Sequence, residues 1–325
     1  RGWSLASPCA NILTSCNMSN ASARDRVTVR VPATTANLGP AFDCMGMALD
    51  LWNVVEVCPL QATSVVVEGV GAAQLPSDEG NLVYQAIAFL YQRVGLPMPT
   101  VSLRCLNQIP LQRGLGSSAA AIVGGLVAAN LLAGQPCSQE ELLALATEME
   151  GHPDNVAPAL LGGCQIVARD GSRLVTAPVP LPPDLGVVLF IPEKTVATKE
   201  ARAILSDTVS REDAVYNMSR VALLVNALAS GRLEDLRVAT QDRLHQPARQ
   251  ALFPAMRTIF REALQAGALG VFLSGSGPTI LALTRGREMT VGYEMAEAAR
   301  KTNVAGEIKV VRPSPVGAYR PELSR

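Results

Sequence analysis

The stretch RGLGSSAAAIVGGLVAANLLAG, residues 113–134, constrains the fold more than any other part of the chain. Two glycines and two serines lead directly into an apolar run rich in alanine and leucine, which predicts a helix over residues 117–132 that is buried on all sides. A flexible turn at the start of a buried helix has two explanations. Small residues let neighbouring elements approach closely, or the turn and the helix N-terminus bind an anion.

The residues of this turn are compatible with both explanations. Gly114 and Gly116 allow backbone N–H groups to point toward one position, while the hydroxyls of Ser117 and Ser118 can cap the helix, bind phosphate or ligate a metal ion. The stretch is not a Walker A motif, because the lysine of that motif is absent. Taken alone, it favours a capped core helix. A hydroxyl pair suits magnesium-bound phosphates only if a carboxylate lies nearby.

The sequence EMEGHPDNVAPALLGG, residues 148–163, supplies such a carboxylate. Glu150 stands at the end of a predicted helix, from which it can reach a cation held by a nucleotide. His152, Asp154 and Asn155 bring three kinds of polar side chain together within four positions. The alternative is structural, with a helix C-cap followed by Asp154 as the N-cap of the next helix. The two interpretations are compatible, and the local pattern leaves both open.

Composition and charge exclude several classes of function. The chain has 325 residues, 48% of them hydrophobic and 17% charged, so it can bury a sizeable core in one large domain or two. Its 28 basic residues balance its 28 acidic residues, which argues against a nucleic-acid partner. No uninterrupted apolar run reaches the roughly 18 residues of a membrane span. Seven cysteines without CxxC spacing predict reduced thiols in the cytoplasm and no zinc site.

Hydrophobic periodicity predicts mixed α and β structure. Helical patterns cover residues 82–94, 117–132, 138–150, 211–228, 233–245, 248–266 and 288–301. Strand patterns cover residues 27–31, 47–57, 64–68, 101–106, 163–168, 185–191, 271–273, 280–283 and 308–311. The proline-rich APVPLPPD at 177–184 predicts a boundary between an N-terminal domain, 25–180, and a C-terminal domain, 181–325.

Residues 1–24 are predicted to be a disordered extension outside the fold. They contain no acidic residue and are rich in serine, alanine and asparagine, a composition typical of a plastid transit peptide. Only two arginines occur there, so translation from upstream of a start at Met18 is the favoured explanation.

Three separated motifs occur in the order found in one superfamily. VPATTANLGPAFDCMGMAL (31–49), PLQRGLGSSAAA (110–121) and SGSGPTILAL (274–283) resemble the galactokinase, homoserine kinase, mevalonate kinase and phosphomevalonate kinase superfamily, the GHMP kinases. The first motif, together with GHPDNVAPALLGG, is most similar to the homoserine kinases. The resemblance extends from Val27 to about Val311, which is essentially the whole predicted fold.

The resemblance implies a fold and an activity. The fold is α+β, the two-domain GHMP kinase fold, with a ribosomal-protein-S5-domain-2-like N-terminal half that binds ATP and a ferredoxin-like C-terminal half. A left-handed crossover in the first half would direct the glycine turn at the phosphates. The implied activity is ATP-dependent phosphorylation of the side-chain hydroxyl of L-homoserine to O-phospho-L-homoserine, a step toward threonine.

The resemblance also implies which residues hold the nucleotide. The glycine turn would wrap the phosphates of ATP, and Ser118 with Glu150 would hold Mg²⁺. The cofactor-binding residues implied in this way are Leu111, Gln112, Arg113, Gly114, Leu115, Gly116, Ser117, Ser118 and Ala119.

The implied amino-acid site needs both signs of charge, because homoserine is a zwitterion. Asp43 would bind the ammonium group, and Arg202 and Arg249 would form bidentate hydrogen bonds to the carboxylate. Without the resemblance, each arginine would be interpreted as solvated surface charge. The implied substrate-binding residues are Asn37, Asp43, Asn155, Thr198, Arg202 and Arg249, and the implied catalytic residues are Asn37, Asn155 and Arg202.

Two departures from the superfamily pattern leave the general base undefined. Thr34 stands where many members have a lysine or arginine, and Asn155 stands where mevalonate kinases place an aspartate. Homoserine kinases share both departures. The alternatives are another small-alcohol kinase of the superfamily and an inactive nucleotide-binding sensor, and a homodimer is left open.

Overall fold

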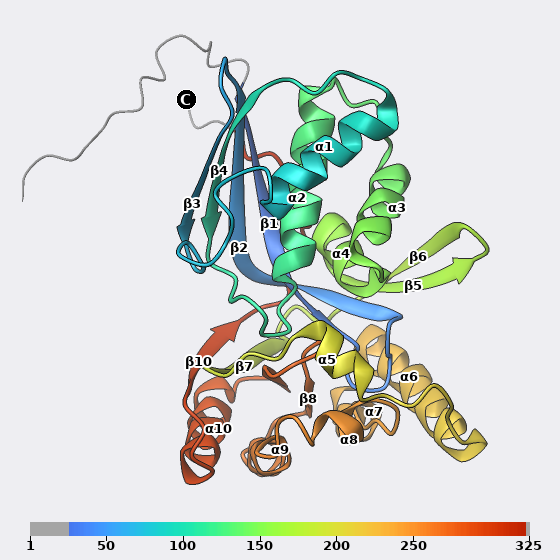
Figure 1. Cartoon of the computed structure of the whole chain (residues 1–325). Helices are drawn as coiled ribbons and strands as arrows, with labels where there is room; N and C mark the ends of the chain where they lie inside the picture. The colour runs from blue at the N-terminus through green and yellow to red at the C-terminus, as the bar shows by residue number, and fades with distance from the viewer. Residues whose placement is uncertain (1–25, 323–325) are drawn as a thin grey trace, which may run out of the picture.

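The computed structural model describes residues 26–322, which form two β-sheets, one above the other, with helices packed on each (Figure 1). The first sheet has six strands in the order β3-β4-β2-β5-β6, with β1 paired to β2. Its strands are β1 (Val27–Ala36), β2 (Met45–Pro59), β3 (Ser64–Gly69), β4 (Val101–Asn107), β5 (Cys164–Asp170) and β6 (Arg173–Val179). Its helices are α1 (Leu82–Val94), α2 (Ser117–Leu132), α3 (Gln139–Glu150) and α4 (Pro153–Leu161).

The second sheet has four antiparallel strands in the order β10-β7-β9-β8. They are β7 (Gly186–Pro192), β8 (Gly270–Leu273), β9 (Ile280–Thr284) and β10 (Gly306–Val311). Numbered within this half, the order is 4-1-3-2, which is the ferredoxin-like arrangement, so the predicted fold class is confirmed. The helices are α5 (Thr198–Ala203), α6 (Arg211–Ser230), η1 (Leu233–Asp235), α7 (Leu236–Ala239), α8 (Gln246–Arg249), α9 (Met256–Gln265) and α10 (Glu288–Lys301).

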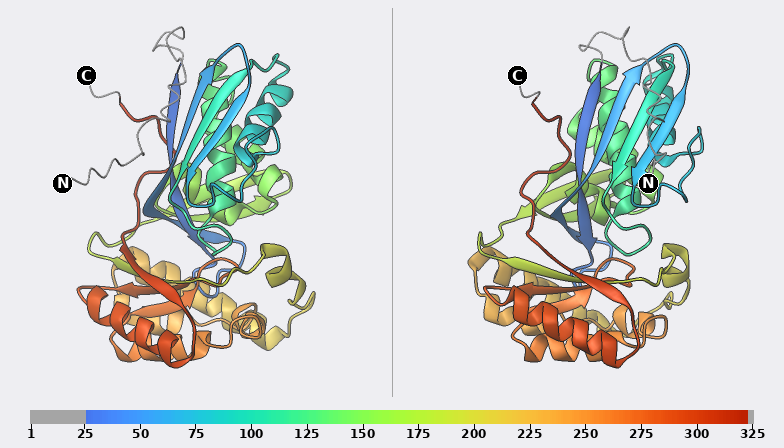
Figure 2. Two further views of the ribbon diagram at one scale, coloured as in Figure 1. Left: turned by 60° about the vertical axis from the view of Figure 1, so that its left-hand side comes forward. Right: turned by 90° about the vertical axis from the view of Figure 1, so that its left-hand side faces the viewer.

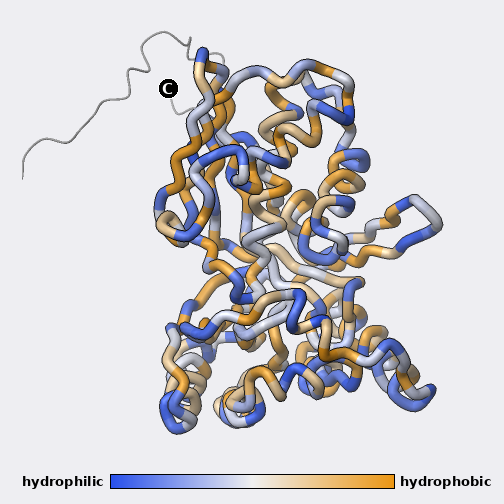
Figure 3. Tube along the Cα trace, viewed as in Figure 1, coloured by the Kyte–Doolittle hydropathy of each residue, from blue (hydrophilic) through white to orange (hydrophobic). Residues whose placement is uncertain are grey.

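Helix α2 is buried because its small residues permit close approach. A Cβ added at Gly124 would lie 2.8 Å from a Val55 methyl, and one added at Gly125 would lie 2.6 Å from the carbonyl O of Val83. Both distances are shorter than packed side chains allow. In the hydropathy colouring of Figure 3, the same helix lies beside the first sheet and is drawn largely in the white-to-orange colours of neutral and apolar residues. The packing explanation therefore holds for the body of this helix.

A C-terminal strap, residues 312–319, leaves β10 and returns to the first sheet (Figure 2). Arg30 and Tyr319 exchange two backbone hydrogen bonds of 2.9 and 3.0 Å, and Ser314 N donates to Ala48 O. Ala318 N donates to Ala159 O. The strap thus joins the two halves. The predicted C-terminal domain, 181–325, includes the strap, although the strap packs on the N-terminal sheet. The boundary at 180/181 stays a prediction.

Some sequence expectations were wrong in detail. The helix predicted over 233–245 ends at Ala239, because the chain turns around the Asp242 carboxylate, which accepts hydrogen bonds from three following amides. The helix predicted over 248–266 is interrupted before Met256, where Pro254 stands. Strand β6 was not predicted. The predicted extension 1–24 lies outside the described residues.

Two composition-based expectations can be compared with the described chain. Within residues 26–322, no helix combines the length and apolar character needed to cross a bilayer. The five cysteines of this part of the chain are free thiols.

Candidate active site

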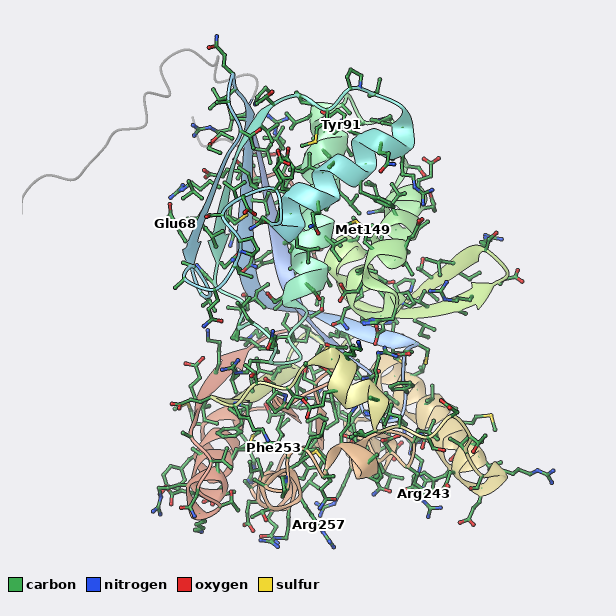
Figure 4. The ribbon with its side chains drawn as sticks, in the orientation of Figure 1. Glu68, Tyr91, Met149, Arg243, Phe253 and Arg257 are labelled. Atoms are coloured by element: carbon green, nitrogen blue, oxygen red, sulfur yellow. The ribbon has the colours of Figure 1, made fainter. Side chains whose placement is uncertain are left out.

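A cavity of about 380 Å³ lies where the two halves meet. Met149, labelled in Figure 4, stands one residue before the end of α3, and the next residue, Glu150, lines this cavity. Every residue that the resemblance placed in the site also lines it except Ala119, which is fully buried. The predicted residues on its wall are Asn37, Asp43, Leu111, Gln112, Arg113, Gly114, Leu115, Gly116, Ser117, Ser118, Glu150, Asn155, Thr198, Arg202 and Arg249.

The glycine turn forms an uncapped helix N-terminus at one end of this cavity. Gly116 is the N-cap of α2, with φ of +69°, and no side chain accepts a hydrogen bond from the first turn. The orphan amides of a helix N-terminus and its dipole attract anions. Ser117 and Ser118 therefore do not cap the helix, contrary to the structural alternative.

Close approach requires both glycines of the turn. A Cβ on Gly116 would lie 1.9 Å from Oγ1 of Thr34, and a Cβ on Gly114 would lie 2.1 Å from the carbonyl O of Ser274. Thr34 N also donates to Leu115 O at 3.1 Å. The turn is thus held against β1 by Thr34 and against the SGSGP loop by the main chain of Ser274, and these contacts leave no room for a side chain.

The side chain of Arg113 holds the turn in place. Its Nε donates to Pro192 O at 2.6 Å, its Nη2 donates to Glu193 O, and its Nη1 donates to Leu111 O. Three carbonyl oxygens therefore occupy this guanidinium, although Arg113 was expected at the phosphates. Its backbone, but not its charge, remains for a nucleotide.

Ser118 and Glu150 form the hydroxyl–carboxylate pair that was expected to hold Mg²⁺. Ser118 Oγ donates to Glu150 Oε1 at 2.6 Å. Burial raises the pKa of Glu150 above its usual range, although the hydrogen bond from Ser118 acts in the opposite direction. Hard oxygen donors of this kind suit Mg²⁺, which is usually held by one or two carboxylates together with substrate phosphates. The donor set therefore fits the ion.

The segment after Glu150 differs from the structural expectation. His152, not Asp154, is the N-cap residue of α4. Asp154 is buried and lies 2.7 Å from Nδ1 of His152. Burial lowers the pKa of His152, but the hydrogen bond and charge of Asp154 outweigh it, so the pKa lies above its ordinary value.

Asn155 is oriented by Thr34, the residue that stands where many members of the resembled superfamily have a lysine or arginine. Thr34 Oγ1 donates to Asn155 Oδ1 at 2.8 Å, and both side chains are buried. Because the amide oxygen is engaged, the NH₂ group of Asn155 remains for a ligand.

Asn37 shapes the loop between β1 and β2. Its Nδ2 donates to Gly275 O at 3.0 Å, and its Oδ1 accepts the backbone N–H of Asp43 at 2.9 Å. Asn37 and Asp43 both have positive φ, at 71° and 57°, which the hydrogen bonds stabilise. Asn37 was expected to act on the substrate, but its amide is used to hold Asp43 in the cavity wall.

Asp43 and Arg202 bind each other. Arg202 Nη1 donates to Asp43 Oδ2 at 2.9 Å and Nη2 donates to Oδ1 at 2.6 Å, a two-pronged pair across 159 positions of sequence. The hydrogen bonds that Arg202 donates to Asp43 raise the pKa of Arg202. The resemblance had placed these two side chains on opposite groups of the substrate. In the structure they neutralise each other.

Arg249 is buried but keeps one amino group open. Its Nε donates to Ala201 O at 3.1 Å, and its Nη1 donates to Gly275 O at 2.9 Å and to Nδ1 of His245 at 3.0 Å. Within residues 26–322 its Nη2 makes no hydrogen bond. Burial, with the nearby charge of Arg202, lowers the pKa of Arg249 to about 10.

Comparison with known proteins assigns the chain to a family. The profile of the GHMP kinase N-terminal domain matches residues 81–163, and that of the GHMP kinase C-terminal domain matches residues 224–301. Homoserine kinase of Moorella thermoacetica is 46% identical over 89% of this chain and 98% of its own length. Homoserine kinase of Trichormus variabilis is 45% identical over 87% of this chain and 95% of its own length. The chain belongs to the homoserine kinase family of GHMP kinases.

A solved structure of a homoserine kinase agrees with this assignment. The crystal structure of homoserine kinase from Cytophaga hutchinsonii superposes with a TM-score of 0.83 at 32% identity, covering 92% of this chain and 98% of that one. The predicted family is therefore confirmed.

Two residues of this homoserine kinase site were missed by the sequence analysis. Phe42 lies 5.5 Å from the guanidinium carbons of both Arg202 and Arg249, and its ring centre is 5.3 Å from that of His245. Their positions next to predicted site residues could have indicated them. Phe42 directly precedes Asp43 in ANLGPAFD, and His245 stands four residues before Arg249 in HQPAR. Thr198, by contrast, makes only a long contact of 3.4 Å with Ser276.

An apolar end of the cavity was also missed. Leu75, Leu82, Val83 and Cys105 line it, and the amide of Asn107 lies among them. These residues come from β4, from the start of α1 and from the loop before it, so no local motif marks them.

Proposed function

We propose that the chain transfers the γ-phosphoryl group of ATP to the side-chain hydroxyl of L-homoserine and releases O-phospho-L-homoserine and ADP. The observation that carries the proposal is the common cavity. An uncapped helix N-terminus, a hydroxyl–carboxylate pair and a set of opposite charges for an amino acid all line it. The homoserine kinases that share 45–46% of its residues support the same activity.

The nucleotide would bind along the glycine turn. The open amide N–H groups at the start of α2 donate hydrogen bonds to its phosphates, and the apolar end around Leu82 and Val83 takes the base. Ser118 and Glu150 hold Mg²⁺, which when bound neutralises charge on the transferred phosphoryl group. The raised pKa of Glu150 makes its charge costly in the empty protein, so a cation there is favoured.

The amino acid would enter by exchanging the Asp43–Arg202 pair. Asp43 takes the ammonium group, while Arg202 and the open Nη2 of Arg249 take the carboxylate. Because a zwitterion brings both charges at once, neither side chain is left unpaired. Mevalonate has no ammonium group and would leave Asp43 without a partner, which argues against the alternative kinase.

Positioning and charge would supply the catalysis. The NH₂ group of Asn155, oriented by Thr34, binds the substrate hydroxyl, and Arg202 adds positive charge beside it. Arg202 lies close enough to Glu150 and Asp154 to sense both charges. A loose phosphoryl-transfer transition state requires little help from a strong base, and none is assigned.

A coupled assay of ADP release tests the proposal. The purified protein is given ATP and Mg²⁺ with homoserine, mevalonate, serine or threonine in turn. Homoserine should give the highest kcat/KM, because only it presents both charges and a hydroxyl on a two-carbon arm. Equal or higher turnover of mevalonate would overturn the substrate assignment, and ATP binding without turnover of any alcohol would favour the sensor.

A further inference from the structure

A buried histidine connects the two charged sides of the amino-acid site. His245 has no exposed surface. Its Nε2 lies 2.7 Å from the carbonyl O of Gly39, in the loop that carries Asp43. Its Nδ1 lies 3.0 Å from Nη1 of Arg249. One ring thus spans the distance from the ammonium side to the carboxylate side.

These contacts determine the protonation of the ring. A carbonyl oxygen can only accept, so Nε2 carries the hydrogen, and a guanidinium can only donate, so Nδ1 is unprotonated. The imidazole is therefore neutral. Burial also lowers the pKa of His245, which favours the same form. Protonation would remove the acceptor for Arg249 and place two positive charges in contact.

Asp242 fixes the main chain that carries the ring. The Asp242 carboxylate is unexposed and accepts the backbone N–H groups of His245 and Gln246 at 3.0 and 2.7 Å. The turn that interrupts the expected helix over 233–245 is therefore the one that places His245. With Nη1 of Arg249 bound to the ring, Nη2 is the amino group that stays open.

We propose that His245 is a positioning residue that sets the separation between the Asp43 loop and Arg249, and so selects α-amino acids. This inference rests on the proposed function and deepens it. His245 acts through other residues and touches neither substrate. A shift at either nitrogen would change the spacing of the two charges that the substrate must bridge, while the glycine turn that binds ATP would be unaffected.

Two conservative variants separate the two contacts. Asparagine carries its amide near the position of Nδ1 and glutamine carries it near Nε2, so His245→Asn keeps the contact to Arg249 and His245→Gln keeps that to Gly39. Each of these two variants should raise KM for homoserine about 10-fold, because each loses one buried hydrogen bond. His245→Leu loses both and should raise KM about 100-fold. KM for ATP should stay within about 2-fold.

Thr240→Val is the matched control for lost stability. Thr240 is buried, its Oγ1 donates to Leu236 O, and its backbone packs against Gly39, but among residues 26–322 it makes no hydrogen bond to Arg249. The variant should lower Tm and leave KM for homoserine unchanged. If it raised that KM as much as the His245 variants do, general loosening of the loop would explain both and the inference would be wrong.

The amide of L-homoserine adds a second readout, because it keeps the hydroxyl and loses the carboxylate. The His245 variants should handle this amide as the unaltered enzyme does, and His245→Leu should add little to Arg249→Leu. Equal effects on acid and amide, or an unchanged KM in His245→Asn and His245→Gln, would overturn the inference. Failure of the proposed function would instead appear in the unaltered enzyme, as absence of homoserine-dependent ADP release.

Discussion

The two ends of the cavity are built in different ways. At the phosphate end, contiguous residues 113–118 form a turn whose shape depends on main-chain contacts and on the absence of side chains at Gly114 and Gly116. At the amino-acid end, charged side chains from separate loops and helices meet, and Asp43 binds Arg202. Under the proposed function, the first end is preformed for its ligand, whereas the charged side chains of the second must exchange partners when the amino acid binds. A backbone site can thus be specified locally, but a charge site depends on tertiary structure.

The largest effect is expected at the turn. Gly116→Ala should lower kcat by about 10³-fold, comparable with the loss of preorganised donors in other enzymes, because its Cβ would lie 1.9 Å from Thr34 Oγ1. Gly134→Ala is the control, since Gly134 also has positive φ but has no atom within 4 Å of an added Cβ. Steady-state kinetics and thermal melting check both variants. Equal activity of the two would show that the turn is not preformed by close contact.

The metal pair should give the next largest effect. Glu150→Gln keeps the size of the side chain and removes its charge, so kcat should fall by about 10²-fold, or about 2.7 kcal/mol of barrier, with a higher Mg²⁺ requirement. Glu148→Gln, two positions earlier on α3 and paired with Arg93 at the surface, should behave like the unaltered enzyme. An unchanged Mg²⁺ titration for Glu150→Gln would remove this residue from the phosphate end.

The amino-acid end should respond through substrate affinity. Arg249→Leu should lower kcat/KM for homoserine by roughly 10- to 200-fold, the cost of losing one charge-assisted hydrogen bond, while KM for ATP stays the same. Arg257→Leu, on the outer face of α9 (Figure 4), is the control. A parallel rise in KM for ATP would mean that the two ends are not separate sites.

The Asp43–Arg202 pair should matter more for binding than for folding. Both side chains are about one-third exposed, at 33% and 35%, and such pairs stabilise a fold by about 1 kcal/mol or less. Asp43→Asn should therefore change the free energy of unfolding, measured in urea, by less than about 1 kcal/mol. The same variant should raise KM for homoserine about 10-fold. A larger loss of stability than of affinity would make the pair structural.

The smallest effect is one of pH on stability without ligands. Burial raises the pKa of Glu150, so the stability it contributes is present below its ordinary pKa of 4.5 and is lost as pH rises through the raised value. Glu150→Gln should then raise Tm at pH 8 by about 1–3 °C, the shift that up to about 1 kcal/mol produces in a chain of this size. At pH 4 the difference should disappear. A lower Tm at pH 8 would contradict the desolvation argument.

The sequence analysis performed best where local patterns decide the structure. Helix bounds of 82–94, 117–132 and 288–301 agree with α1, α2 and α10, and the capping box at Ser138 and Glu141 is present. These elements are specified by periodicity and by residues within one turn of each other.

The misses share a physical cause, which is distance along the chain. Three contacts join segments far apart in sequence: the pair between Asp43 and Arg202, the hydrogen bond from Arg113 to Pro192 O, and the bridge made by His245. A motif can indicate which residues enter a site, but it does not show which of them form hydrogen bonds or ion pairs with one another there. The break after Ala239 was missed because Asp242 binds amides that a continuous helix would have used.

The C-terminal strap has a consequence for how the chain is made. The strap, residues 312–319, pairs with the edge of β1 at Arg30 and contacts α4 through Ala159, so this edge of the first sheet has no partner until the strap has left the ribosome. Domains generally fold in order of synthesis, but here β1 waits for a segment that is made after the whole second sheet. Throughout translation that strand presents an unpaired edge, the kind of surface that associates with other chains. Removing the strap would leave this edge exposed. The yield of non-aggregated protein would then fall, even if the protein that folds keeps its catalytic activity.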